Sequence, residues 1–89
     1  MPKLDGLALL KEMQQRWSVP CGFTDVDEML HMEGLDAVDI VTPTGSHRDL
    51  ALKAIAAGKH VLCEKPMATR YQDAADMLRA WRSSGRKLM

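Results

Sequence analysis

The chain has 89 residues, of which 46% are hydrophobic and 27% are charged, a composition typical of a globular domain and not of a disordered segment. Its 12 basic and 12 acidic residues cancel, so no net field favours nucleic acid or an anionic membrane as a partner. No apolar run approaches the roughly 18 residues that cross a bilayer, so no membrane span is expected.

Residues 1–5 lack the apolar run of a secretory signal. The two cysteines, Cys21 and Cys63, lie too far apart in sequence for a C-x-x-C metal or redox motif, so no metal site is expected. Together these features favour a reducing cytoplasm as the location of the protein.

The first part of the chain predicts two helices. Apolar residues recur at helical spacing through residues 2–16, with a proline near the start. Phe23 is expected to close a short extended piece. Thr24 and Asp27 then resemble a capping box, which predicts a short helix from there to about His31.

A strand, a helix and a second strand follow. Residues 37–42 form an apolar strand pattern that ends at Pro43, and residues 60–65 form another. Between them a helical pattern runs over about residues 46–57, with Gly58 as the residue that closes it. This order predicts a βαβ unit with parallel strands and a right-handed crossover.

The C-terminal part predicts one more helix and the start of a strand. Thr69 and Gln72 resemble a second capping box, and Gly85 is expected to end the helix. The apolar stripe that this helix should bury consists of Tyr71, Ala74, Ala75, Leu78 and Trp81. Residues 87–89 resemble the opening of a further strand.

The predicted fold class is therefore α/β with a parallel sheet and flanking helices. Two strands, with a third only begun, leave open edges, and parallel sheets need cover on both faces. We therefore expect a piece of a larger domain, or a chain that associates with itself or a partner through its open sheet edges. Ligands of such sheets bind at the carboxyl ends of the strands, where residues 42–47 and 64–66 place polar groups.

Two runs resemble the Gfo/Idh/MocA oxidoreductases: DAVDIVTPTGSH at residues 36–47 and AGKHVLCEKPMA at residues 57–68. The resemblance covers residues 19–89 well. It implies an incomplete Rossmann-like, doubly wound parallel sheet, with residues 1–89 as a partial NAD(P)-binding domain. The glycine-rich first βαβ turn, the acidic strand end that reads the ribose and the substrate domain of the family have no counterpart in these residues.

The resemblance also implies a function. The parent would be an NAD- or NADP-dependent oxidoreductase that moves hydride between nicotinamide and a hydroxyl of a sugar, cyclitol or nucleotide sugar, and the piece alone would be inactive. Lys65 would be the catalytic lysine, which polarises the reacting hydroxyl. Pro66 would fix the backbone there, with either a trans or a cis peptide bond before it. The implied cofactor-binding residues are Thr42, Pro43, Thr44, His47, Glu64, Lys65 and Pro66.

Simpler interpretations stay open for these residues. Lys65 could be an exposed lysine beside Glu64, in a surface pair worth less than about 1 kcal/mol. Pro66 could only turn the chain. His47 could pack on its loop at a helix start instead of lying near a phosphate, and Ser46 could be the N-cap.

Two other functions compete with the enzyme. A non-catalytic, Rossmann-like assembly piece would dimerise through its sheet edge without binding nicotinamide. A receiver-domain-like signalling fragment is suggested by residues 1–10, which resemble the segment after the phosphorylated aspartate of such domains. The TPTGSH and EKP runs have no place in the receiver pattern.

Overall fold

The computed structural model describes residues 6–89, which fall into two units divided after residue 32. The first unit contains α1 (Gly6–Trp17) and α2 (Val26–Leu30). The helix expected from residue 2 is thus confirmed from residue 6 onward, and residues 1–5, with the start of the receiver-like run, lie outside the described part. No helix within residues 6–89 is long and apolar enough to span a membrane.

The predicted start of α2 is off by one residue. Asp25 is the N-cap, and its Oδ1 accepts a hydrogen bond from the backbone N–H of Asp27 at 3.0 Å. Thr24 does not cap the helix, because the aspartate directly before the helix already satisfies that free donor. Phe23 lies in irregular chain, so the extended piece expected there does not become a strand.

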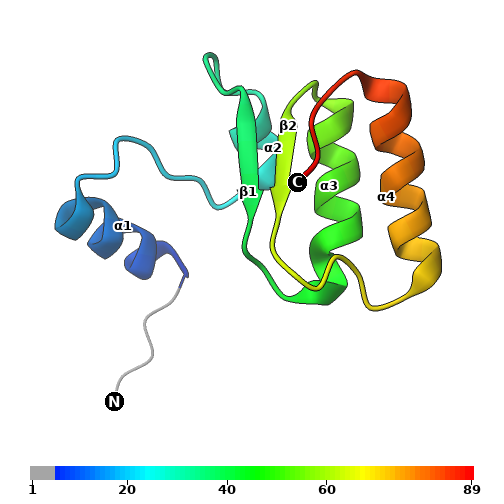
Figure 1. Ribbon diagram of the computed structural model, residues 1–89. Coiled ribbons are helices and arrows are strands. Elements are labelled where there is room, and N and C mark those ends of the chain that lie inside the picture. The colour runs from blue at the N-terminus through cyan, green and yellow to red at the C-terminus, as the bar shows by residue number, and fades with distance from the viewer. Residues whose placement is uncertain (1–5) are drawn as a thin grey trace. The chain divides into compact units, whose positions relative to one another are not determined.

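The second unit contains the predicted βαβ unit. Its elements are β1 (Ala37–Ile40), the 3-10 turn η1 (Thr44–Ser46), α3 (His47–Ala56), β2 (His60–Cys63) and α4 (Tyr71–Ser84) (Figure 1). β1 and β2 pair in parallel, with Ala37 opposite His60 and Ile40 opposite Cys63. Both strands end two residues earlier than expected, at Ile40 and Cys63, because pairing stops where the chain turns into the loops that follow.

β2 has a second neighbour. The N–H of Val61 donates to the carbonyl of Lys87 at 2.8 Å, and the N–H of Met89 donates back to Val61 at 2.9 Å, in a parallel bridge centred on Leu88. The strand opening predicted at residues 87–89 is therefore confirmed. Within the described residues, β1 pairs on one side only and is the edge of the sheet.

The core of the second unit forms where α3 packs on both strands and on α4, which lies beside it (Figure 1). Its buried apolar residues are Ile40, Ala51, Ala54, Val61 and Met77. The two alanines let α3 approach its neighbours closely. Gly58, with φ of 80°, ends α3 as predicted: its N–H donates to Ile55, and that of Lys59 donates to Ala54.

The prediction for α4 is partly wrong. Tyr71 is 89% exposed, and Met77, outside the predicted stripe, is fully buried because it lies on the side of α4 that faces α3. The second capping box is absent: Arg70 stands at the N-cap without a side-chain hydrogen bond, and the Gln72 amide donates to Asp76 at 2.9 Å. Gly85 ends α4 as predicted, in the left-handed conformation.

Candidate functional site

The loops that leave the carboxyl ends of β1 and β2 start side by side. The N–H of Glu64 donates to the carbonyl of Ile40 at 3.0 Å, which adds one hydrogen bond to the ladder beyond the last paired residues. We call residues 41–46 the first strand-end loop and residues 64–70 the second. Because both loops follow the carboxyl ends of parallel strands, they occupy the position where such sheets bind ligands.

The first strand-end loop is held by its own hydroxyl groups. The hydroxyl and the N–H of Ser46 both donate to the carbonyl of Pro43, at 2.7 and 2.9 Å. Since that hydroxyl hydrogen is used, Thr42 is the donor in its 2.6 Å hydrogen bond to Ser46. Ser46 stands at the N-cap of α3 without capping through its side chain. A Cβ built on Gly45 meets no atom within 4 Å, so the turn faces open space.

His47 joins the two strand-end loops. Its side chain is buried, with 1% of the residue exposed. Nε2 lies 2.8 Å from the carbonyl oxygen of Thr42, in the first loop, and Nδ1 lies 3.0 Å from that of Pro66, in the second. The carbonyl of Met67 is a further partner of Nδ1, at 3.3 Å.

The second strand-end loop presents a lysine that has no charged partner in the described part of the chain. The peptide bond between Lys65 and Pro66 is cis, and residues 64–66 are all exposed. The Glu64 carboxylate accepts from the backbone N–H of Lys65 at 3.3 Å and forms no ion pair with its ammonium. Within residues 6–89, the structure gives the Lys65 ammonium no hydrogen bond or ion pair. The simpler interpretation as a surface pair therefore does not describe this lysine.

A mostly apolar hollow of about 260 Å³ lies beside Lys65. Its lining residues are Cys63, Lys65, Met67, Leu78, Leu88 and Met89. Burial raises the pKa of the Cys63 thiol, and the charges of Glu64 and Asp39 raise it further. Cys63 is therefore protonated near neutral pH and suits a wall of the hollow better than a nucleophile.

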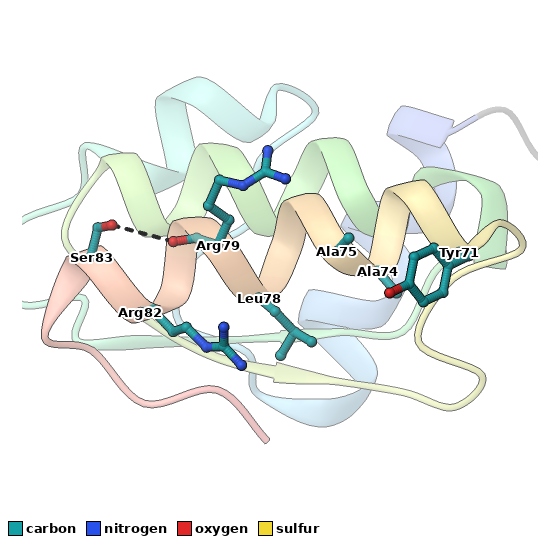
Figure 2. A pocket seen from close by; sticks show the side chains of 7 residues that line it. All are labelled: Tyr71, Ala74, Ala75, Leu78, Arg79, Arg82 and Ser83. Atoms are coloured by element: carbon teal, nitrogen blue, oxygen red, sulfur yellow. Dashed lines mark hydrogen bonds between the residues drawn. The ribbon is translucent and has the colours of Figure 1, made fainter.

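A separate hollow of about 380 Å³ runs along α4 (Figure 2). It is lined by Tyr71, Ala74, Ala75, Leu78, Arg79, Arg82 and Ser83. The hydrogen bond drawn there, from the Ser83 hydroxyl to the Arg79 carbonyl at 3.3 Å, is internal to the helix (Figure 2). None of the predicted site residues lines it, so it is distinct from the strand-end loops.

The structure brings the predicted site residues together at the carboxyl ends of the two strands. Their contacts with a cofactor stay a prediction. Sequence reasoning missed two members of the network, Ser46 as a loop-holding hydroxyl and Met67 as a carbonyl partner of His47. The role of Ser46 is only weakly indicated by the sequence, as a serine inside the TPTGSH run. The role of the Met67 carbonyl is not indicated at all, because every residue has a backbone carbonyl. Within residues 6–89 no cluster of three or more metal-binding side chains occurs.

Comparison with known proteins finds a family match over nearly the whole chain. Residues 6–89 match the GFO_IDH_MocA family, described as an oxidoreductase family with an NAD-binding Rossmann fold. The match starts within the receiver-like run and continues to the last residue, so it gives the receiver alternative no support.

Individual relatives are similar over the same region. The chain is 47% identical over 62 residues to a 1,5-anhydro-D-fructose reductase of Ensifer adhaerens, covering 70% of this chain and 19% of the relative. It is 39% identical over 67 residues to the scyllo-inositol 2-dehydrogenase (NADP(+)) IolU of Bacillus subtilis, covering 75% and 20%. The chain thus spans about a fifth of the length of these curated relatives.

A solved structure shows the same fold. The WlbA dehydrogenase from Bordetella pertussis, in complex with NADH and UDP-GlcNAcA, superposes with a TM-score of 0.80 at 32% identity. The superposition covers 90% of this chain and 23% of that one. The parallel sheet with flanking helices is therefore that of a Rossmann-fold dehydrogenase.

Proposed function

Because the chain belongs to the Gfo/Idh/MocA family of oxidoreductases, we propose that it forms part of an NAD(P)-binding Rossmann domain. The intact enzyme moves hydride between nicotinamide and a carbon that carries a hydroxyl group, on a sugar, cyclitol or nucleotide sugar. The names of the relatives support this substrate class: one reduces an anhydrofructose, another oxidises an inositol, and a third is bound to a UDP-sugar.

The cofactor is held by the two strand-end loops. The residues proposed to contact the cofactor directly are Thr42, Pro43, Thr44, Glu64, Lys65 and Pro66. His47, predicted with them from the sequence, is buried and contributes by holding the two loops together. The donor set fits a dinucleotide, because hydroxyl and carboxylate oxygens suit ribose hydroxyls and the open turn at Gly45 before α3 suits a phosphate. When bound, the nicotinamide supplies the hydride acceptor or donor. The proposal does not choose between NAD and NADP, because the acidic strand-end residue that binds the ribose hydroxyl and distinguishes the two cofactors has no counterpart in these residues.

Lys65 carries the chemistry in this proposal. Its ammonium lacks a partner in the described residues and stands where the two loops converge, beside the hollow of about 260 Å³. When hydride reaches a carbonyl carbon, negative charge develops on the oxygen, and a hydrogen bond from this ammonium stabilises it. In the reverse direction the same hydrogen bond stabilises the oxygen as the hydroxyl gives up its proton and before hydride leaves the carbon bonded to it. The unpaired charge at this position is the single observation that carries the assignment.

A second proposed role is association. Within the described residues β1 has one free edge, which can pair with a second copy or with more of the same domain. As a non-catalytic assembly piece, the chain would use this edge and bind no nicotinamide. Cys21 and Cys63 are free thiols, which suits the proposed reducing cytoplasm.

Hydrogen–deuterium exchange of the intact protein, with and without NADH or NADPH, tests the cofactor site. We expect slower exchange in residues 42–47 and 64–70 when cofactor is present. Residues 57–59, at the amino end of β2, serve as the internal control and should not change. Unchanged exchange in both loops at saturating cofactor would refute the site, and protection of residues 37–40 that depends only on protein concentration would favour the assembly role.

A further inference from the structure

His47 is the one buried polar or charged side chain in the described part of the chain, and it sits between two stretches of backbone. Both of its ring nitrogens face carbonyl oxygens, those of Thr42 and Pro66, at 2.8 and 3.0 Å. A ring engaged in this way has little of its surface left for a ligand. Any contribution of His47 to a reaction must therefore pass through the backbone that it holds.

The chemistry of the two contacts is directional. A carbonyl oxygen only accepts hydrogen bonds, so each contact requires a hydrogen on the ring nitrogen that faces it. A neutral imidazole supplies one such hydrogen and a protonated imidazole supplies both. The contact of Nε2 stays near the helix start that carries His47, whereas the contact of Nδ1 reaches 19 residues along the chain, to the second strand-end loop.

The Nδ1 contact ends next to Lys65. Pro66 follows Lys65 directly, and its ring restricts its own backbone angle φ. Holding the Pro66 carbonyl therefore restricts where the Lys65 backbone lies relative to β1 and the first loop. The Glu64 carboxylate also accepts from the N–H of Lys65, at 3.3 Å, but it belongs to the same loop, so this bond does not tie the loop to the rest of the unit as His47 does.

We propose that His47 is a positioning residue for Lys65, with Nδ1–H donating to the carbonyl of Pro66. The imidazole ties the second strand-end loop to the first and so sets the point from which the lysine reaches the substrate. This inference rests on the proposed function, because it takes Lys65 to be the group that meets the substrate hydroxyl. A misplacement of about 1 Å at a reacting group can cost on the order of 10²-fold in rate.

Three substitutions in the intact enzyme separate the two ring contacts. The amide nitrogen of His47→Asn stands close to the position of Nδ1, and that of His47→Gln close to the position of Nε2, while His47→Leu keeps neither donor. We expect kcat to fall about 10²-fold in His47→Leu, to recover most in His47→Asn and to recover less in His47→Gln. Equal kcat in the Leu variant and the wild type, or a Gln variant at least as active as Asn, would overturn the proposal.

A double-mutant cycle distinguishes positioning from general support of the fold. If His47 acts through Lys65, then His47→Leu lowers kcat no further in a Lys65→Ala background. A similar fall in both backgrounds would show that His47 only supports the structure. If Lys65→Ala itself leaves kcat unchanged, the proposed function fails and the positioning role fails with it.

The hydrogen bond itself can be measured without any variant. In the ¹⁵N-labelled wild-type protein, the ring N–H at Nδ1 of His47 should give a resonance that exchanges slowly with water, because it is buried and bonded. An unprotonated Nδ1 would overturn the positioning role whatever Lys65 does. A protected Nδ1–H together with an inert Lys65→Ala variant would place the failure in the proposed function instead.

Discussion

At the scale of single residues, three neighbouring positions show how environment decides chemistry. Lys65 is exposed, and its ammonium has no partner among residues 6–89; His47 is buried with both nitrogens engaged; and Cys63 is a half-buried thiol whose pKa is raised. Only the first has a charged group free to meet a ligand. The residue type alone would have made all three equal candidates for catalysis.

The raised pKa of Cys63 predicts a slow thiol. Burial is its main cause, with Glu64 and Asp39 adding to it, so the thiolate fraction at pH 8 is smaller than that of an unstructured cysteine. In a Cys21→Ser background, Cys63 should react with iodoacetamide several-fold more slowly than the thiol of a short peptide. Glu64→Gln should raise the rate. A Cys63 as fast as the peptide thiol would contradict this explanation.

At the scale of elements, the contact between α3 and α4 holds the helical layer together. Met77 is completely buried in α4, whereas the next residue, Leu78, is 37% exposed. Arg48 of α3 donates from Nε to Asp76 of α4 at 3.0 Å, across the same contact. Two predictions concern this pair of helices.

Truncation of Met77 should be costly. Met77→Ala removes buried atoms and leaves a cavity, so we expect a loss of about 2–5 kcal/mol in the free energy of unfolding, and a clearly smaller loss for Leu78→Ala. Urea unfolding of the intact protein, followed by the fluorescence of Trp81 in a Trp17→Phe background, would measure both. Equal losses would mean that α4 is rotated about its axis relative to this structure.

Asp76 should stabilise the helix pair in a pH-dependent way. The hydrogen bond from Gln72, followed by that from Arg48, holds the pKa of this carboxyl below its ordinary range. A lowered pKa in the folded state means that the stabilisation is complete above the pKa of the unfolded chain. It is then lost as the pH falls through the folded-state value.

Asp76→Asn tests this linkage. The variant should be less stable than the wild type at neutral pH, and the difference should shrink below pH 4 as the wild-type carboxyl becomes protonated. Asp49→Asn is the matched control, since Asp49 bonds the same arginine from within α3 at 2.7 Å but is exposed. A stability difference that stays constant from pH 7 to pH 3 would contradict the explanation.

At the scale of the whole molecule, the sequence predicted the elements better than their packing. Hydrophobic period and glycine positions located the βαβ unit, the end of α3 at Gly58 and the strand opening at residues 87–89. Capping was missed because an adjacent carboxylate, Asp25, competes with Thr24 for the same backbone donor. Tyr71 was misplaced because helical period fixes the spacing of a stripe, but the neighbouring α3 decides which side is buried.

The candidate site was predictable only in part. The strand ends and the two motifs identified the residues, and the parallel sheet brings them together. The link from His47 to Pro66 could not be predicted, since it joins a side chain to a backbone carbonyl 19 residues away. Local patterns carry no information about such a contact.

The 89-residue chain alone should have low stability. Leu62 of β2 is 46% exposed and Val41 is 68% exposed, although parallel sheets are normally covered on both faces. We expect a urea melt of the isolated chain to be broad, or to depend on protein concentration through association. A sharp, concentration-independent transition worth several kcal/mol would contradict the proposal that these residues are part of a larger domain.

The most direct test of the central claim is the kcat of Lys65→Ala in the intact enzyme, measured with a sugar or cyclitol substrate and NAD or NADP. Lys59→Ala is the matched control, because Lys59 directly precedes the amino end of β2, whereas Lys65 follows its carboxyl end. If Lys65 assists hydride transfer, its removal should lower kcat by about 10²-fold or more, and the control should keep wild-type activity. An unchanged kcat in Lys65→Ala would show that this lysine is not the catalytic group.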